Sequence, residues 1–213
     1  MIFGTKHKKK SDYIPKIQIN GETLDIVEET KFLGVILDSE LSWTNHISYT
    51  SKKLAKSIAI LSKTRPFLNK STLLQLYYSF MYPYLIYGNL LWGNAPAKTL
   101  WPIYKLQKIA IRLVTNTRRG NSTQTHCKKL RILRLPEIYI YSTSVFMFKF
   151  HHKMMPPALD NLFTKNNAIH SYNTRGASRL RNPKIRTNIA DRFITATGVR
   201  IWNNLSYHTD TTQ

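Results

Sequence analysis

KFLGVILDSELSW, residues 31–43, is the stretch around which this chain is organised. An apolar run at 32–37 leads into Asp38, Ser39 and Glu40, which are typical turn residues, and Trp43 follows. The pattern before this stretch is typical of strands, and the pattern after it is mostly helical. We therefore expect an α+β fold, with a small antiparallel β unit followed by a helical body.

Two strand signals precede the helices. Apolar and polar residues alternate between positions 14 and 27 around Asn20-Gly21. This dipeptide favours a two-residue type I′ turn, because both of its residues must adopt positive φ. We predict a hairpin there. The run at 32–37 predicts a third strand, in which Gly34 allows close backbone approach.

The first two helical patterns lie at 45–65, which Pro66 ends, and from Asn69 onward. Residues 73–92 are apolar enough to resemble a membrane span in length. They also contain Pro83, a glycine, polar amides and five tyrosines. A buried helix pair, kinked or broken at the proline, is the better interpretation, and we expect no membrane contact.

The helix expected at 100–115 is amphipathic. At about 100° per residue, Lys105, Lys108 and Arg112 share a narrow arc. The separate apolar arc consists of Leu106, Ile109, Ala110 and Leu113. A solvated face is the ordinary role of such cations. Phosphate contact is favoured here because no acidic residue occurs between positions 41 and 136 to form i,i+4 pairs.

The charge of the whole chain points to a polyanionic partner. There are 32 Lys and Arg against 11 Asp and Glu, which gives a net charge of +21. Seven of the acidic residues precede Leu41, so the excess lies in the helical body and in the tail. Nucleic acid is the expected partner. The single cysteine, Cys127, excludes an internal disulfide and fits a reducing compartment.

Further cations follow the amphipathic helix. A polar loop contains Arg118 and Arg119, and the next basic run begins with Lys128 and Lys129. We predict that these residues also contact nucleic acid. Beyond position 157 the composition changes to Asn, Thr, Ser and Arg, which predicts a basic irregular tail. Residues 193–202 fit either a strand or a helix.

Catalytic signals are weak. Two-metal chemistry needs clustered carboxylates, and the few present fit turns and strand edges better. The histidines and Cys127 match no zinc spacing, and no Gly-rich phosphate loop occurs. Aromatic residues interleave the cations, and their spacing between leucines favours a core role over base stacking. These residues are Tyr77, Tyr78, Tyr82, Tyr84, Tyr87, Trp101 and Tyr104.

In their order, several motifs resemble the C-terminal part of the reverse transcriptases of jockey-like non-LTR retrotransposons. They are KFLGVILDSELSW, LYYSFMYPYLIYGNLLWG at 76–93, KLQKIAIRLV at 105–114, YNTRG at 172–176 and GVRIWNNLS at 198–206. The likeness covers nearly the whole chain.

The resemblance implies the end of the palm at 1–43, a helical thumb at 44–157 and a basic tail at 158–213. In that family the thumb cradles the template–primer duplex, and a hairpin grips the primer. The hairpin residues would be Phe32, Leu33 and Gly34. The paired palm aspartates that hold Mg²⁺ have no counterpart in this sequence. The expected protein is a truncated RNA-directed DNA polymerase that binds an RNA–DNA hybrid or RNA template sequence-tolerantly, with no catalytic residue or cofactor of its own.

Three alternatives remain open. The chain would be a general RNA- or DNA-binding basic protein, a nonfunctional retroelement relic, or part of an active polymerase if it belongs to a longer product. The resemblance implies an intracellular location, in nucleus and cytoplasm. The sequence leaves the oligomeric state open.

Overall fold

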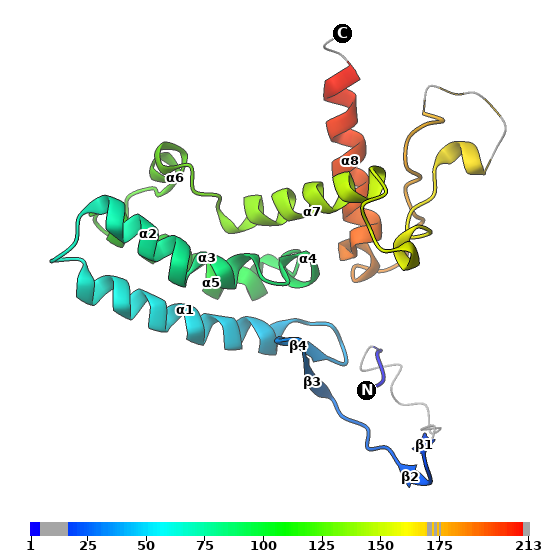
Figure 1. Ribbon diagram of the computed structural model, residues 1–213, viewed down its shortest axis with the longest axis horizontal. Coiled ribbons are helices and arrows are strands. Elements are labelled where there is room, and N and C mark those ends of the chain that lie inside the picture. The colour runs from blue at the N-terminus through cyan, green and yellow to red at the C-terminus, as the bar shows by residue number, and fades with distance from the viewer. Residues whose placement is uncertain (5–16, 170–171, 173, 175, 211–213) are drawn as a thin grey trace. The chain divides into compact units, whose positions relative to one another are not determined.

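The computed structural model describes residues 1–4, 17–169, 172, 174 and 176–210. Contacts divide the chain into two compact units. The first contains Met1–Tyr84 and Ala95–Asn121, and the second contains Leu85–Asn94 and Ser122–Gln213. The expected α+β fold is confirmed, because two antiparallel strand pairs precede a helical body (Figure 1).

The Asn-Gly hairpin is confirmed, although positions 14–16 of its alternating run lie outside the described residues. Strands β1 (Gln18–Ile19) and β2 (Glu22–Thr23) pair antiparallel, with Ile19 opposite Glu22. Asn20 has φ 52° and Gly21 has φ 84°, as a type I′ turn requires. All four strand residues are exposed, so local turn chemistry, with no buried face, defines this hairpin.

The prediction of a single strand over 32–37 is wrong. Strands β3 (Glu29–Phe32) and β4 (Val35–Asp38) form a second antiparallel hairpin, with Phe32 opposite Val35. Leu33 and Gly34 form its turn, with φ values of 45° and 80°. Glycine adopts positive φ without steric cost, and this lets Gly34 reverse the chain inside an apolar run.

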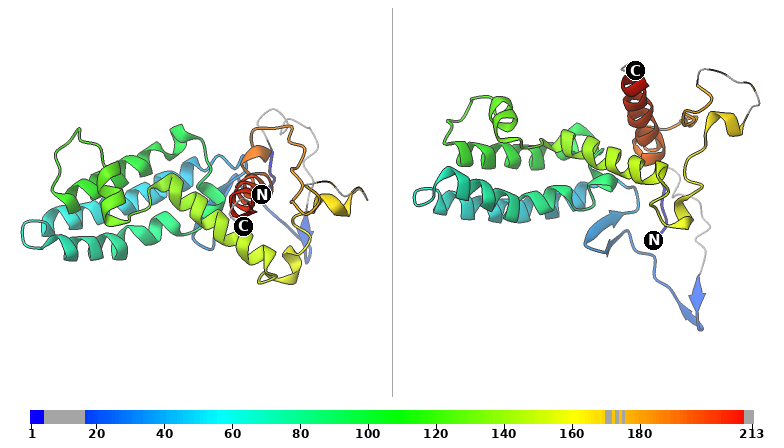
Figure 2. Two further views of the ribbon diagram at one scale, coloured as in Figure 1. Left: turned by 90° about the horizontal axis from the view of Figure 1, so that it is seen from above. Right: turned by 45° about the horizontal axis from the view of Figure 1, so that its top comes forward.

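Helices α1 (Thr44–Thr64), α2 (Lys70–Phe80) and α5 (Ala97–Thr115) form the body of the first unit. Helix α1 packs along both α2 and α5 (Figures 1 and 2). The Asn69 side chain accepts a hydrogen bond from the backbone N–H of Thr72 at 2.9 Å and caps α2. The buried core consists of Ile47, Leu54, Leu61, Leu73, Tyr77, Met81, Ile103, Ala110, Ile111 and Val114. The predicted helices are therefore confirmed.

The chain enters the second unit within α3 (Tyr82–Ile86), and α4 (Asn89–Trp92) follows there. The expected break near Pro83 is confirmed, because Met81 and Gly88 separate three short helices in place of one long one. Across the described residues, no helix combines the length and the apolar character that crossing a membrane requires.

The second unit also contains α6 (Gln124–Leu130), α7 (Leu135–His151) and α8 (Ile194–Asp210). Short 3-10 turns lie at Pro157–Leu159, Asn166–Ala168 and Ala190–Arg192. Helix α8 crosses α7 (Figures 1 and 2), and Met147, Leu180 and Val199 form a buried cluster between the elements of this unit. The ambiguous residues 193–202 are thus mainly helical.

The compact units do not follow the segments 1–43, 44–157 and 158–213. Helix α5 packs on α1 and therefore belongs to the same unit as the β hairpins and the first helices. Helix α7 packs instead with α4 and α8, so residues on both sides of position 157 share the second unit. Long-range packing of this kind leaves no signal in local composition.

Candidate nucleic-acid interface

The orientation of α5 determines which cations face solvent. Its buried residues are Ile103, Gln107, Ala110, Ile111 and Val114. Of the predicted apolar arc only Ala110 is buried, while Leu106, Ile109 and Leu113 are half-buried. Helix α5 is therefore rotated about its axis relative to the predicted apolar arc. The prediction missed this rotation because a polar residue, Gln107, lies in the core, where its Nε2 donates to the Tyr77 hydroxyl at 3.0 Å.

With Gln107 buried, the predicted basic arc lies opposite the core. Positions 105, 108 and 112 fall about 160°, 100° and 140° away from Gln107 around the helix. Lys105 is exposed, and Lys108 and Arg112 are half-exposed. We call Lys105, Lys108, Arg112, Arg118 and Arg119 the basic ridge. All five belong to the first unit.

Two aromatic rings accompany Lys108. Its Nζ lies 4.2 Å from the ring centroid of Tyr104 and 5.5 Å from that of Trp101. These distances allow cation–π attraction, which holds the ammonium along the helix surface. Trp101 is 55% exposed, so it presents a ring face or edge to solvent beside the cation. An exposed ring next to a positive charge suits a nucleic-acid partner.

Arg112 contacts the loop that follows α5. Its Nη2 donates to the backbone oxygen of Asn121 at 3.1 Å, whereas its Nε is shielded from solvent and has no hydrogen-bond partner among the described residues. At the start of the loop, Asn116 adopts φ 52° and its side-chain oxygen accepts from Arg65 Nη2. Arg112 and Arg65 therefore hold the two ends of the loop.

Arg118 and Arg119 lie between these two ends and are exposed. Gly120 follows with φ 97°, a conformation that favours glycine. The sequence predicted both arginines as binding residues but missed Arg65, which precedes a proline at the end of α1 and gave no signal beyond its charge. Because Arg65 contacts Asn116, it adds a further cation at the base of this loop.

The helical part of the first unit contains no carboxylate, since residues 41–136 include neither Asp nor Glu. Two ion pairs of the described residues, Arg134–Glu137 and Arg200–Asp191, both lie in the second unit. Hence none of the basic-ridge cations is neutralised by an acidic side chain of its own helix or loop. Their charges are available to an anion outside the chain.

Lys128 and Lys129 lie in the second unit and are described separately from the ridge. Both are exposed on α6, near its C-terminal end, where cations interact favourably with the helix dipole. Cys127 of the same helix is buried, and burial is the main reason why the pKa of its thiol is raised. The thiol is therefore protonated and does not fit a nucleophile.

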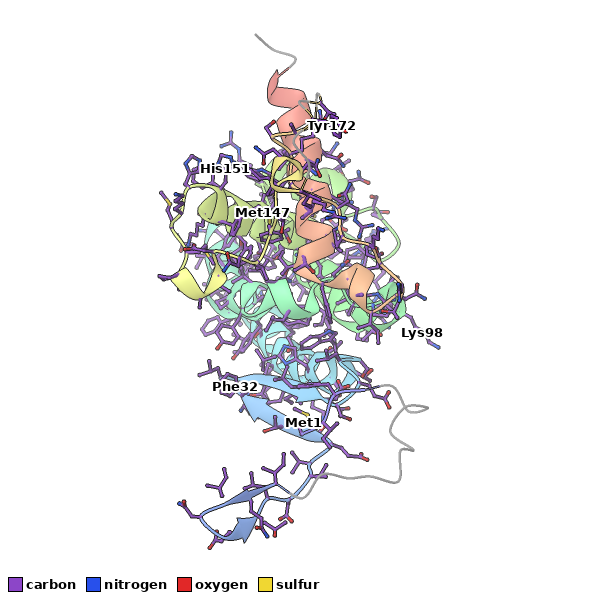
Figure 3. The ribbon with its side chains drawn as sticks, turned by 90° about the vertical axis from the view of Figure 1, so that its right-hand side faces the viewer. Met1, Phe32, Lys98, Met147, His151 and Tyr172 are labelled. Atoms are coloured by element: carbon purple, nitrogen blue, oxygen red, sulfur yellow. The ribbon has the colours of Figure 1, made fainter. Side chains whose placement is uncertain are left out.

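The second predicted binding element is the turn of the β3–β4 hairpin. Phe32 and Leu33 are 63% and 74% exposed there, and Figure 3 labels Phe32 at the end of its strand. The base of the hairpin is attached to α1. The backbone N–H of Ile36 donates to Nδ1 of His46 at 3.3 Å, and Asn45 donates to Glu29 at 2.5 Å.

The core role expected for the interleaved aromatics is wrong for most of them. Tyr77 is fully buried, but Tyr78, Tyr84, Tyr87 and Trp101 are exposed. Tyr84 lies on the short helix α3 and Tyr87 just after it, so the spacing between leucines did not reveal their exposure.

The carboxylate of Asp38 stabilises a turn, as its sequence context predicts. Its Oδ1 accepts from the backbone N–H groups of Glu40 and Ser42, at 3.1 and 2.9 Å. Its Oδ2 accepts from the N–H of Trp43 at 3.0 Å. Among the described residues, no three His, Cys, Asp or Glu side chains come together in a group that would hold a metal ion. No family model, curated protein or solved structure matches this chain.

Proposed function

We propose that this chain binds the phosphate backbone of a nucleic-acid duplex through the basic ridge, with little dependence on sequence. The observation that carries this proposal is the position of the three helix cations of the ridge, which lie away from the buried face of α5 in a helical region without carboxylates. Phosphate oxygens would replace the missing acidic partners.

The ridge offers two kinds of cation. Lys105 and Lys108 present ammonium groups, which act as point charges on phosphate oxygens. Arg118 and Arg119 present guanidinium groups, which bind phosphate in bidentate fashion. Each neutralised phosphate releases counterions, so the slope of log K against log salt is about −0.9 per contact on duplex DNA. Backbone contacts of this kind carry no base information, and the expected binding is therefore sequence-tolerant.

The nucleic acid that we propose as the partner is an RNA–DNA hybrid or an RNA template. The support is the resemblance of the motifs to the thumb and palm end of non-LTR reverse transcriptases, together with an exposed apolar turn at Phe32 and Leu33, the positions of the primer-gripping hairpin. The paired catalytic aspartates of that family have no counterpart here, so the proposed role of this chain is binding and not nucleotide transfer. An intracellular place of action, in nucleus and cytoplasm, belongs to the same proposal.

The test compares two triple variants. The first removes the helix cations of the ridge: Lys105→Ala, Lys108→Ala and Arg112→Ala. The second, a charge-matched control, removes Lys52, Lys56 and Lys63, which are exposed on α1 and share one arc. Affinity for an RNA–DNA primer–template is measured by fluorescence anisotropy, with heparin as a competing polyanion.

We expect the ridge variant to lose about tenfold or more in affinity, and the control to lose much less. Equal losses in both variants, together with equal binding of heparin and the hybrid, would mean that the chain is only a general polycation. That result would favour the alternative of a basic protein without a defined nucleic-acid site.

A further inference from the structure

The second unit contains a polar pocket that none of the predicted binding residues lines. Its volume is about 540 Å³, within the range of small-molecule sites. The residues that matter for its chemistry are Asn166, Arg179, Arg181, Asn182, Asn203 and Asn204. The α8 residues Asn203 and Asn204 supply one wall, and the segment around Leu180 supplies another.

Two arginines reach the pocket because of the local backbone. Lys165 and Leu180 form an isolated antiparallel bridge, and the N–H of Arg181 donates to the Thr164 carbonyl at 2.8 Å. Leu180 is buried in the cluster with Met147 and Val199, and Arg179 and Arg181, its neighbours in sequence, are exposed and both line the pocket.

Asparagine side chains hold this segment in place. The Asn203 amide donates to the Leu180 carbonyl at 2.9 Å and accepts from the Leu180 N–H at 3.3 Å. Another asparagine, Asn166, donates from its Nδ2 to the Gly176 carbonyl at 2.8 Å. The backbone that carries the two arginines is therefore ordered by the protein itself, which lowers the cost of binding a ligand there.

The charge of the pocket selects an anion. None of the residues that line it is acidic, and two of the carboxylates in this unit, Glu137 and Asp191, are paired with Arg134 and Arg200. We propose that this pocket binds the phosphoryl group of a nucleotide, with Arg179 and Arg181 contacting the phosphate oxygens. Two arginines in the lining of one pocket suit this ligand, because guanidinium groups bind phosphate oxygens in bidentate fashion.

The amides favour a nucleotide over a simple carboxylate. Asn182 and Asn204 each offer donors and an acceptor, which suit the edge of a base or the hydroxyls of a sugar. A volume of about 540 Å³ also exceeds what a lone carboxylate or phosphate would fill. This inference does not depend on the basic ridge, because the two sites share no residue.

The test measures binding of adenosine monophosphate by isothermal titration calorimetry at low salt. The double variant Arg179→Ala/Arg181→Ala should lose about tenfold or more in affinity. The matched control, Lys184→Ala/Arg186→Ala, removes the same charge from exposed neighbours that do not line the pocket, and should change the affinity less than about twofold. Asn204→Ala should weaken binding without a change in salt dependence.

Further probes identify the source of the phosphoryl group. Tighter binding of a short single-stranded RNA than of the mononucleotide, with loss of both in the double variant, assigns the site to a strand; the reverse order assigns it to a free nucleotide. Equal loss in the two charge-matched variants would overturn the proposal, as would equal competition by an acidic peptide. The ridge triple variant should bind the mononucleotide like the unchanged chain, so the two proposals fail separately.

Discussion

Gln107 on α5 donates a hydrogen bond from its Nε2 to the hydroxyl of Tyr77 on α2, at 3.0 Å, and both side chains are almost completely buried. This contact lies on the face of α5 that is opposite the basic arc. It therefore links core packing to the direction in which Lys105, Lys108 and Arg112 face. A polar pair in the core also specifies rotation of the helix more narrowly than apolar contacts alone.

The pair should contribute measurably to stability. Tyr77→Phe removes the hydroxyl that Gln107 contacts and leaves a buried amide without that partner, so we expect a loss of about 1–3 kcal/mol. Gln107→Leu in the same background should recover part of this loss, because both polar groups are then absent. Urea unfolding of the two single variants and the double variant measures the coupling. Additive losses would show that the hydrogen bond is not important.

His46 should make stability depend on pH. Burial lowers the pKa of His46 below its ordinary value of 6.5, and its Nδ1 accepts from the Ile36 N–H. The unfolded chain therefore binds the proton more readily than the folded chain. The contribution of His46 is complete above pH 6.5 and is lost as the pH falls below that value toward the lowered folded pKa.

The variant His46→Asn keeps an acceptor but does not titrate in this range. Urea unfolding should show a smaller decrease in stability between about pH 8 and about pH 5 for the variant than for the unchanged chain. The same decrease in both proteins would contradict the role assigned to His46.

Asp38 should stabilise the junction between β4 and α1. Its carboxylate accepts from the N–H groups of Glu40, Ser42 and Trp43, and from the Ser42 hydroxyl at 3.2 Å. We expect Asp38→Ala to cost about 2 kcal/mol, in line with the loss of several hydrogen bonds to a charged group. Glu40→Ala removes the same charge from the same turn and should stay within about 0.5 kcal/mol. Similar losses for both would mean that charge, and not the turn, matters.

Gly198 lies where α8 approaches α7 closely. A Cβ built at this position would lie 2.8 Å from Sδ of Met147 and 3.3 Å from Cδ1 of Ile194. Helix propensity alone predicts that Gly198→Ala stabilises the chain by about 1 kcal/mol. The close contact predicts the opposite, a loss of about 1–3 kcal/mol. A raised melting temperature in the alanine variant would contradict the packing of these two helices.

The turn of the β3–β4 hairpin should affect binding more than folding. Phe32→Ser and Leu33→Ser replace exposed side chains, so we expect stability to change by less than about 0.5 kcal/mol. If the turn contacts the primer strand, the double variant should bind the hybrid at least about fivefold more weakly. Ile19→Ser, at an equally exposed position of β1, is the control. Unchanged hybrid affinity in the double variant would remove the hairpin from the site.

Local signals in the sequence were sufficient for much of the fold. Asn20-Gly21 determined one hairpin, and Pro66 and Asn69 marked the end of α1 and the start of α2. The residue pattern missed the second hairpin, which only the family resemblance implied, because its turn places a leucine, Leu33, at positive φ, and an apolar run gives no warning of this. The rotation of α5 was missed because it depends on a partner on another helix, Tyr77.

The candidate sites likewise include one that the sequence predicted and others that it did not. The arc of Lys105, Lys108 and Arg112 follows from helical periodicity, so the sequence predicted it. The contact of Arg65 with Asn116 and the pocket around Arg179 and Arg181 join residues far apart in the chain. No local pattern encodes such neighbours. They require the packing of whole elements to be known.

The most direct test of the central claim is a salt series. Binding of the unchanged chain and of the Lys105→Ala/Lys108→Ala/Arg112→Ala variant to an RNA–DNA hybrid is measured over a range of salt concentrations. The basic ridge predicts a steep linear fall of log K with log salt for the unchanged chain, and a slope that is shallower by about 2–3 in the variant. Identical slopes and affinities for the two proteins would contradict the assignment of α5 to the phosphate backbone.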